Sequence, residues 1–486
     1  MVREQDLRSA DYEETKSLFD LMEPPGPDAL APVVLLSGEW LLKRAAKLRA
    51  VSREERLKMK LPRRQDLERD HPEAFLGGDP SKCRQTLEDP QFGLPRGPPV
   101  ISNPLPLISV SHCWHSKAHP DPYGDNLLAL ADAIEARIKV GKDEKEAVLS
   151  DDPARRDAAA KALKELGGSA PDTEFGVFMD WVSLHQRGEE GADRTEDEEH
   201  AFSTALARMQ LWYAHQKTLV YLLTAIPPEW IAERKANGEK APIPHKGRGW
   251  PTLERLVCML VKSHSSKSWA TIVNVGDSKD GPKPPLTPKD FKSLLKKLTF
   301  TNGADKEVVN ALYDTTIKTA LGGQKVLRYA GLGWRDEEIK QLCKVLPLCR
   351  SLESLNLKGT SNRYTSASAK MLANLLGERK NLPELRWLGV GCVANEKGLV
   401  RNLTSEKETG RVPEPLLDDK SLIAVCEMRG IQLRRDVDEK HEAAGRRASL
   451  APSANSRRSS MDESSVKLVN QESIKDMTPD QEVFGQ

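Results

Sequence analysis

The sequence predicts an α/β fold with a wound parallel sheet. Three short apolar runs, at 105–114, 175–186 and 218–224, have the length of strands, and helical patterns lie between them. The run at 175–186 does not alternate between apolar and polar residues, which favours a strand covered on both faces. It breaks at Asp180 into polar residues, which we therefore expect at the carboxyl end of that strand. Ligands of open α/β sheets bind at this end.

Composition limits the class of protein. The 486 residues give room for two or three domains. A formal net charge of +1 gives no reason to expect nucleic-acid binding. The seven cysteines are scattered without a C-x-x-C pair, which argues against a disulfide framework or zinc ribbon and indicates a reducing compartment. The N-terminus has no apolar signal core, and no apolar run reaches the length of about 18 residues that a membrane span needs. We therefore expect a cytoplasmic protein.

Changes in composition divide the chain into five predicted segments. They are an N-terminal basic helical region and linker (1–104), the α/β domain (105–278), a linker and helix (279–325), a block of repeats (326–435) and a disordered tail (436–486). Acidic residues mixed with Pro and Gly predict a loose lead-in over residues 1–38. The tail is rich in Ser, Arg and Glu and poor in apolar residues, which is typical of disorder.

The stretch 39–69 carries eleven Lys and Arg residues, and its apolar residues recur at roughly helical spacing. These apolar residues are Trp40, Leu41, Ala45, Leu48 and Val51. A basic amphipathic helix can lie on an anionic membrane surface or dock a partner. The alternative, which we favour, is a solvated helix with one face packed on the domain.

Four further helices are predicted from apolar residues at helical spacing. They cover 126–140, an Ala-rich stretch at 153–166, a segment in which Phe202, Leu206, Met209 and Tyr213 share one face, and a segment that begins near Pro251. Proline suits the first turn of the last of these. The others lie between the predicted strands, as a wound sheet requires.

A repeated pattern begins near residue 326. The pattern L-x-x-L-x-L starts at Leu352 and recurs 30 residues later at Leu382, and Leu327 fits the same frame 28 residues before Leu355. Helical segments lie between these positions, at 336–346 and 366–376. The block resembles the long, ribonuclease-inhibitor type of leucine-rich repeat, in which each strand and helix stacks on its neighbours. Three such units predict a short docking or stabilising module.

Three strings in the predicted α/β domain together resemble the signature blocks of the heterokaryon-incompatibility (HET) domain. In chain order they are Ser111-His-Cys-Trp114, Asp180-Trp-Val-Ser-Leu-His-Gln186, and Arg248-Gly249-Trp250 with Glu254 four residues after the Trp. Met209 and Tyr213 fit the block between the second and the third. The resemblance covers residues 105–262 and implies a flavodoxin-like wound sheet, because HET domains are considered relatives of the Toll/interleukin-receptor (TIR) fold.

The TIR relationship implies a candidate site. TIR domains that cleave NAD carry a Trp-Cys-x-x-Glu pattern at a helix start, and the glutamate is catalytic. Trp250 and Glu254 occupy the Trp and Glu positions of this pattern, whereas the Cys position is Pro251. The resemblance therefore implies that Glu254 is a catalytic carboxylate and that Trp250 lines the pocket that binds NAD. It places Ser111, Trp114 and Asp180 in the same strand-end crevice.

One carboxylate is chemically sufficient for this reaction. Nicotinamide leaves the cationic glycosidic bond as a neutral molecule, so it needs no general acid, unlike a sugar alcohol. A single carboxylate can bind the ribose hydroxyls and stabilise the developing oxocarbenium charge. The alternative is that Glu254 is a first-turn acid stabilised by the helix dipole and that Trp250 is a core residue.

Two other groups of residues contain types that bind metals or act as nucleophiles. His112, Cys113, His115 and His119 are metal-ligand types. However, strand alternation points His112 away from Cys113 and no second ligand pair has a familiar spacing, so we expect no metal. Cys113 with His185 and Asp180 has the residue types of a thiol nucleophile with its base. The alternative is that Cys113 is a buried structural cysteine.

Two functions from different classes follow. The first is an intracellular signalling or scaffold protein whose HET/TIR-like domain self-associates or binds a protein partner, with the repeats as an added surface. The second is an enzyme, an NAD glycohydrolase (NAD nucleosidase) that uses Glu254 and takes NAD as its substrate rather than as a bound cofactor. In the tail, Arg446-Arg447-Ala448-Ser449 resembles a basophilic kinase site, with Ser449 as the acceptor; the alternative is an unmodified polar tail.

Overall fold

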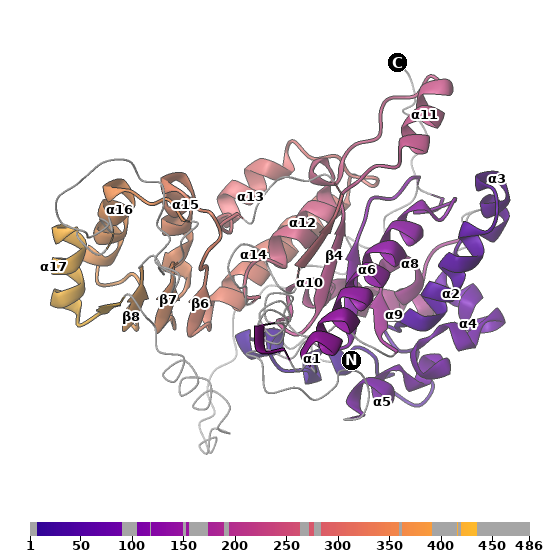
Figure 1. Ribbon diagram of the computed structural model, residues 1–486. Coiled ribbons are helices and arrows are strands. Elements are labelled where there is room, and N and C mark those ends of the chain that lie inside the picture. Colours follow the sequence, from indigo (N-terminus) through magenta and orange to yellow (C-terminus); the bar gives the residue numbers. More distant parts are fainter. Residues whose placement is uncertain are drawn as a thin grey trace. The chain divides into compact units, whose positions relative to one another are not determined.

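Two β-sheets with helices around them make up the described part of the chain, so the expected α/β class is confirmed (Figure 1). The computed structural model describes residues 7–89, 105–116, 118–148, 152–154, 174–188, 194–262, 272–276, 283–358, 362–390, 416 and 419–434. The chain divides into two compact units, Met1–Asp438 and Glu439–Gln486, and every described residue belongs to the first. Among the described residues, no helix has both the length and the hydrophobicity of a membrane span.

The first sheet has five strands in the order β1-β3-β2-β4-β5. They are β1 (Leu36–Ser37), β2 (Leu107–Ser111), β3 (Gly176–Phe178), β4 (Leu219–Leu223) and β5 (Ile272–Val275). β1 is antiparallel to β3, and the other pairings are parallel. All three predicted strands are therefore confirmed. β3 is shorter than its apolar run because the chain turns into the short helix α8 (Asp180–Ser183), whose Ser183 hydroxyl accepts the backbone N–H of Met179 at 3.1 Å.

Every residue of β2 and β4 is buried, as expected of strands covered on both faces. The helices of this part are α6 (Asp125–Val148), α9 (Glu196–Ala207), α10 (Gln210–Ala214), α11 (Pro228–Ala236) and α12 (Gly249–Val257). The prediction of one continuous helix through Tyr213 is wrong, because Arg208 (φ −123°, ψ 15°) leaves the helical region between α9 and α10. After this break every residue of α10 is buried, whereas α9 begins with four acidic residues. The Ala-rich helix predicted at 153–166 lies almost wholly outside the described residues.

The N-terminal segment is packed against the sheet, so the predicted loose lead-in is wrong. Tyr12, Leu18 and the run 33–36 are buried, and the run continues into β1 beside β3. The Ser9 hydroxyl also donates to the Ala320 carbonyl. Proline and glycine at 24–27 break the regular structure, but the apolar residues on both sides of them still bury surface.

The basic stretch 39–69 forms several short helices, and the first of them buries Leu41, Ala45 and Leu48 on one face, as the favoured interpretation predicts. They are α2 (Gly38–Arg49), α3 (Arg53–Arg56), a 3₁₀ turn at Leu57–Met59, and α4 (Arg64–Asp70). Ser52 starts α3 with a capping box, and Pro62 precedes α4. Several of the cations bind within the chain: Arg49 pairs with Asp132 and Glu135 on α6. Arg64 is buried among backbone carbonyls.

The second sheet has four parallel strands in chain order, β6-β7-β8-β9. The strands are β6 (Val326–Arg328), β7 (Ser354–Asn356), β8 (Trp387–Gly389) and β9 (Gln432–Arg434), and the helices are α15 (Asp336–Val345), α16 (Ser366–Gly377) and α17 (Lys420–Arg429). Both predicted helices of this block are confirmed. The strand β9 and the helix α17 were not predicted, because Gln-Leu-Arg is too short and polar to stand out.

The repeat frame predicted for this block is correct for one step and wrong for the next. Leu327 pairs with Leu355, as the spacing of 28 predicts. Leu355 then pairs with Leu388 and not with Leu385, so the strand begins three residues later than the sequence pattern indicates. The shift follows a turn at Leu382, which has a positive φ of 48°. Arg429 holds this turn by donating to the carbonyls of Leu376, Asn381 and Leu382.

Hydrogen bonds and ion pairs connect the parts of the chain that carry the two sheets. The Tyr329 hydroxyl, next to β6, donates to the Leu260 carbonyl beyond α12 at 3.1 Å. Lys283 pairs with Glu338 of α15 at 2.8 Å. The remaining helices are α1 (Lys16–Phe19), α5 (Cys83–Glu88), α13 (Pro288–Leu295) and α14 (Asp305–Gly322), of which α14 packs against α12.

Candidate functional site

Polar residues from three distant parts of the chain meet at the carboxyl ends of β2 and β3. We call this group the strand-end cluster: Ser111, His112, Trp114, Asp180, His245 and Glu254. The Ser111 hydroxyl donates to Glu254 Oε2 at 2.5 Å and lies 2.8 Å from His245 Nε2. His112 Nε2 lies 3.0 Å from Asp180 Oδ1, and the Trp114 indole N–H donates to Asp180 Oδ2 at 2.9 Å.

Strand register and helix packing bring these residues together. β2 and β3 are parallel, with Ser109 opposite Phe178, so Ser111 and Asp180 both follow the last paired residues. Glu254 comes from α12, which packs against β2 and α10. Gly249 at the start of α12 lies directly under the Phe300 ring, where a Cβ would overlap the ring. The glycine of the Arg248-Gly249-Trp250 string therefore has a packing role.

Burial controls the charge of Glu254. The residue is only 5% exposed, and burial raises the pKa of its carboxyl to about 8, an effect that the Ser111 hydrogen bond opposes and the nearby Asp180 charge reinforces. Glu254 is therefore mainly protonated at neutral pH. Burial also lowers the pKa of His245 to about 3, so this imidazole is neutral. The geometry then assigns the proton to His245 Nε2, which donates to Ser111 Oγ while Ser111 donates to Glu254.

His112 and Asp180 form the charged half of the cluster. Burial acts to lower the pKa of His112, but its hydrogen bond to Asp180 and the Asp180 charge outweigh burial and raise the pKa. Burial likewise acts to raise the pKa of Asp180, and His112 outweighs it, so that pKa is lowered. The cluster thus holds one protonated acid, Glu254, and one ionised acid, Asp180. Two carboxyls with pKa values pushed apart are typical of functional sites.

The structure brings four of the five candidate residues into the strand-end cluster, where Ser111 binds Glu254 and Trp114 binds Asp180. Ser111, Trp114, Asp180 and Glu254 belong to it, whereas Trp250 does not. The Trp250 indole N–H donates to Asp305 Oδ2 on α14 at 2.9 Å, so this side chain ties α12 to α14. The pocket-lining role implied for Trp250 has no geometric support here.

Sequence reasoning missed His245 and His112 as members of the cluster, and it missed the contact that Tyr213 makes with the cluster. His245 follows a Pro-rich stretch and carries no periodic signal, so its contact with Ser111 depends on tertiary structure alone. Tyr213 was matched only as a signature position, yet its hydroxyl donates to the Val110 carbonyl at 3.2 Å and also interacts with Glu254. Pairing of His112 with Asp180 was not anticipated either, because His112 was considered as a metal ligand.

The metal and thiol alternatives lack the necessary geometry. Among the described residues, no group of three or more His, Cys, Asp or Glu side chains is arranged to hold a metal ion. Burial raises the pKa of the Cys113 thiol to about 11, which leaves little nucleophilic thiolate at neutral pH. His185 Nε2 lies 3.8 Å from Glu68 Oε2, and the Asp180 carboxylate is hydrogen-bonded to His112 and Trp114. These residues therefore form no nucleophile set with Cys113.

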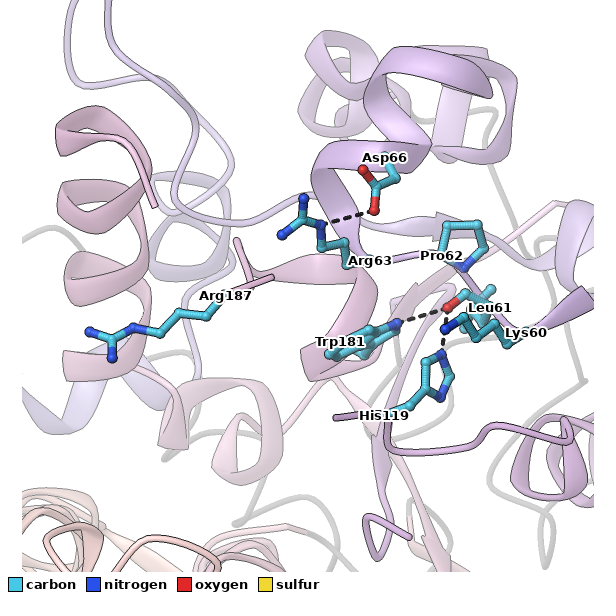
Figure 2. Close-up of a pocket in the computed structure, with 8 residues that line it drawn as sticks. All are labelled: Lys60, Leu61, Pro62, Arg63, Asp66, His119, Trp181 and Arg187. Atoms are coloured by element: carbon cyan, nitrogen blue, oxygen red, sulfur yellow. Dashed lines mark hydrogen bonds and ion pairs between the residues drawn. The ribbon is translucent and has the colours of Figure 1, made fainter. Parts of the chain in front are cut away.

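A surface hollow lies near the cluster, but none of the six cluster residues lines it. Figure 2 shows the hollow around Trp181, the residue after Asp180, and Glu254 is absent from its lining. Trp114 and Trp181 meet edge to face, with ring centroids 5.5 Å apart. Ser111, His112, His245 and Glu254 of the cluster are buried, whereas Trp114 and Asp180 are partly exposed.

Neither a known family model nor a curated protein sequence matches this chain. The candidate acceptor Ser449 lies outside the described residues.

Proposed function

We propose that this chain is an intracellular signalling or scaffold protein, in which a HET/TIR-like domain acts through self-association or partner binding. The order of the parallel strands supports the TIR-like interpretation. Numbered along the chain, the four parallel strands of the first sheet follow the order 2-1-3-4, which is the order at the start of a flavodoxin-like sheet. The stacked strand and helix units of the second sheet support the leucine-rich repeat interpretation.

The hydrogen bonding of the strand-end cluster residues to one another is the observation that favours a scaffold. The Ser111 and Glu254 side chains are directed at each other, and Asp180 is directed at His112 and Trp114. Such a network joins β2, the end of β3 and α12 rather than presenting free groups to a substrate. The signature residues would then be kept to hold the sheet's carboxyl edge in one arrangement, while the surface binds the partner.

Self-association predicts a molar mass above the monomer value. Light scattering on the full chain is expected to give a mass that exceeds 54.0 kDa and rises with protein concentration. β5 is the terminal strand of the first sheet among the described residues, and lysine on an edge strand disfavours edge pairing. Asn274→Lys on β5 should therefore lower the mass, whereas the matched surface change Asn237→Lys after α11 should not.

A constant monomer mass at all concentrations would exclude self-association. A mass that Asn274→Lys leaves unchanged would exclude β5 as the contact.

The second candidate function is NAD glycohydrolysis, which the position of Glu254 favours. Its carboxyl sits beside an ion pair at the carboxyl edge of a parallel sheet, where such folds bind ligands. In this reaction the bond between ribose C1′ and the nicotinamide nitrogen breaks, and its electron pair leaves with nicotinamide. Water adds to C1′ and loses a proton. Glu254 would stabilise the oxocarbenium charge in its ionised form, and Asp180 would add to the negative field.

This candidate predicts release of nicotinamide from NAD by the full chain. The rate is expected to increase as the pH rises towards 8, because the pKa of Glu254 is about 8 and the ionised form is needed. Glu254→Gln keeps the shape but not the charge and should reduce release at least about a hundredfold. Glu135→Gln, on the α6 surface, is the control and should retain the rate. If no nicotinamide appears, including from concentrated protein, the enzyme interpretation is wrong.

A further inference from the structure

We propose that the hollow beside Trp181 binds a small molecule through a phosphate or pyrophosphate group. Its volume is about 290 Å³, and its walls come from two segments, 60–66 and 181–187, together with His119. Figure 2 shows the Trp181 indole in the middle of the lining side chains, with Arg187 on one side and Lys60 on the other. This site does not depend on the function proposed above.

The charge of the hollow selects an anion. Lys60, Arg63 and Arg187 supply three cations, whereas Asp66 is the single carboxylate in the lining. His119 adds no charge, because its Nδ1 accepts the Asp121 backbone N–H at 3.0 Å and its Nε2 lies 2.9 Å from the Leu61 carbonyl. This pattern assigns the neutral imidazole with its proton on Nε2. The lining therefore has an excess of two positive charges.

The floor of the hollow is fixed before any ligand arrives. The Trp181 indole N–H and His119 Nε2 both bind the Leu61 carbonyl, each at 2.9 Å. Gln65 and Gln186 exchange two hydrogen bonds between the two walls, at 2.7 and 3.1 Å. A preformed site loses less entropy on binding than a site that must order itself.

The side chains also differ in how freely they can turn towards a ligand. Arg63 is held by Asp66 at 2.9 Å, whereas Arg187 is exposed and forms no ion pair among the described residues. Arginine matches the oxygens of a phosphate with two parallel N–H groups, and lysine adds a point charge. The apolar floor of Leu61, Pro62 and Trp181 excludes water below the anion, which strengthens these contacts.

These properties define the class of ligand. A phosphomonoester or a pyrophosphate carries at least two negative charges and so complements the excess positive charge. A volume of about 290 Å³ lies at the lower end of the range for small-molecule sites, so it holds such a group and part of the molecule that carries it.

Calorimetric titration of the full chain with sodium pyrophosphate and with ADP, at low ionic strength, tests this site. We expect saturable binding of both probes that weakens as sodium chloride is added. The Lys60→Gln and Arg187→Gln double variant should weaken binding by about tenfold or more, because it removes two of the three cations. Arg187→Gln alone changes an exposed residue, so its expected weakening of several-fold gives a measurement that does not depend on refolding of the site.

The matched control is the Lys47→Gln and Lys58→Gln double variant, which removes two exposed positive charges outside the lining. It should retain the affinity of the native chain within about twofold. Absence of saturable binding for both probes would overturn the site. Equal weakening in the two double variants would also overturn it, because binding would then reflect only the general charge of this region.

Discussion

Replacing Arg64 by methionine is expected to lower the free energy of unfolding by about 3 to 5 kcal/mol. Arg64 is 1% exposed, and its guanidinium donates to the carbonyls of Ala31, Pro32 and Ser183. It also pairs with Glu68 at 2.8 Å. Methionine fills part of the space but leaves the two buried carbonyls of Pro32 and Ser183, and the partly buried one of Ala31, without this donor and Glu68 without its partner. Equilibrium unfolding in urea, followed by far-ultraviolet circular dichroism, measures the loss.

Arg69→Met is the control for this experiment. Arg69 lies on the same helix, but its side chain is 66% exposed, and its pairs with Asp66 and Asp70 are surface pairs. This change should lower the free energy of unfolding far less than Arg64→Met does, because exposed ion pairs contribute little. Comparable losses for the two variants would show that Arg64 does not hold the N-terminal segment to the turn after β3.

The second large effect is a dependence of stability on pH that comes from Glu254. The pKa of this carboxyl is about 8 in the folded protein and near 4.5 when unperturbed. Between these values the folded chain keeps a proton that the unfolded chain has lost. The contribution of Glu254 is therefore fully present below about pH 4.5 and declines by up to about 1.4 kcal/mol per pH unit until the pH passes 8.

Glu254→Gln isolates this contribution, because glutamine is neutral at every pH and similar in shape. Urea unfolding of both proteins from pH 5 to pH 8.5 should show the variant gaining stability relative to the native chain as the pH rises. Other groups titrate in both proteins, so only the difference between them reports Glu254. A difference that does not change with pH would show that this carboxyl is already ionised in the folded state.

The sequence was sufficient to predict the three central strands of the first sheet and the helices α6 and α12, but not β1, β5, α8 or α11. β2, β3 and β4 are buried on both faces, and short, largely apolar segments of this length favour such strands. The burial of the N-terminal segment was underestimated, because the buried run 33–36 lies in a stretch whose Pro and Gly residues predict a loop. The repeat frame failed where Leu382 adopts a left-handed backbone, which no periodic pattern reveals.

For the strand-end cluster, sequence predicted the position of residues better than their partners. Ser111 and Asp180 could be placed at one edge because parallel strands share a carboxyl end, whereas Glu254, on α12, was placed there only by the resemblance to TIR domains. Their hydrogen bonds depend on side-chain directions that spacing does not fix. Trp250 shows this limit: it is four residues before Glu254, yet its N–H binds Asp305, 55 residues away.

The antiparallel pairing of β1 with β3 limits where the chain can be truncated for experiments. An excised fragment of residues 105–278, the unit that composition delimits, would lack the outermost neighbour of Val177 and the cover that Leu35 and Phe75 provide. Such a fragment would expose unpaired backbone groups and apolar side chains along one edge of the sheet, which favours aggregation. Aggregation of this fragment would therefore give no information about self-association of the full chain. Only proteins that keep the first 89 residues are suitable for measuring self-association.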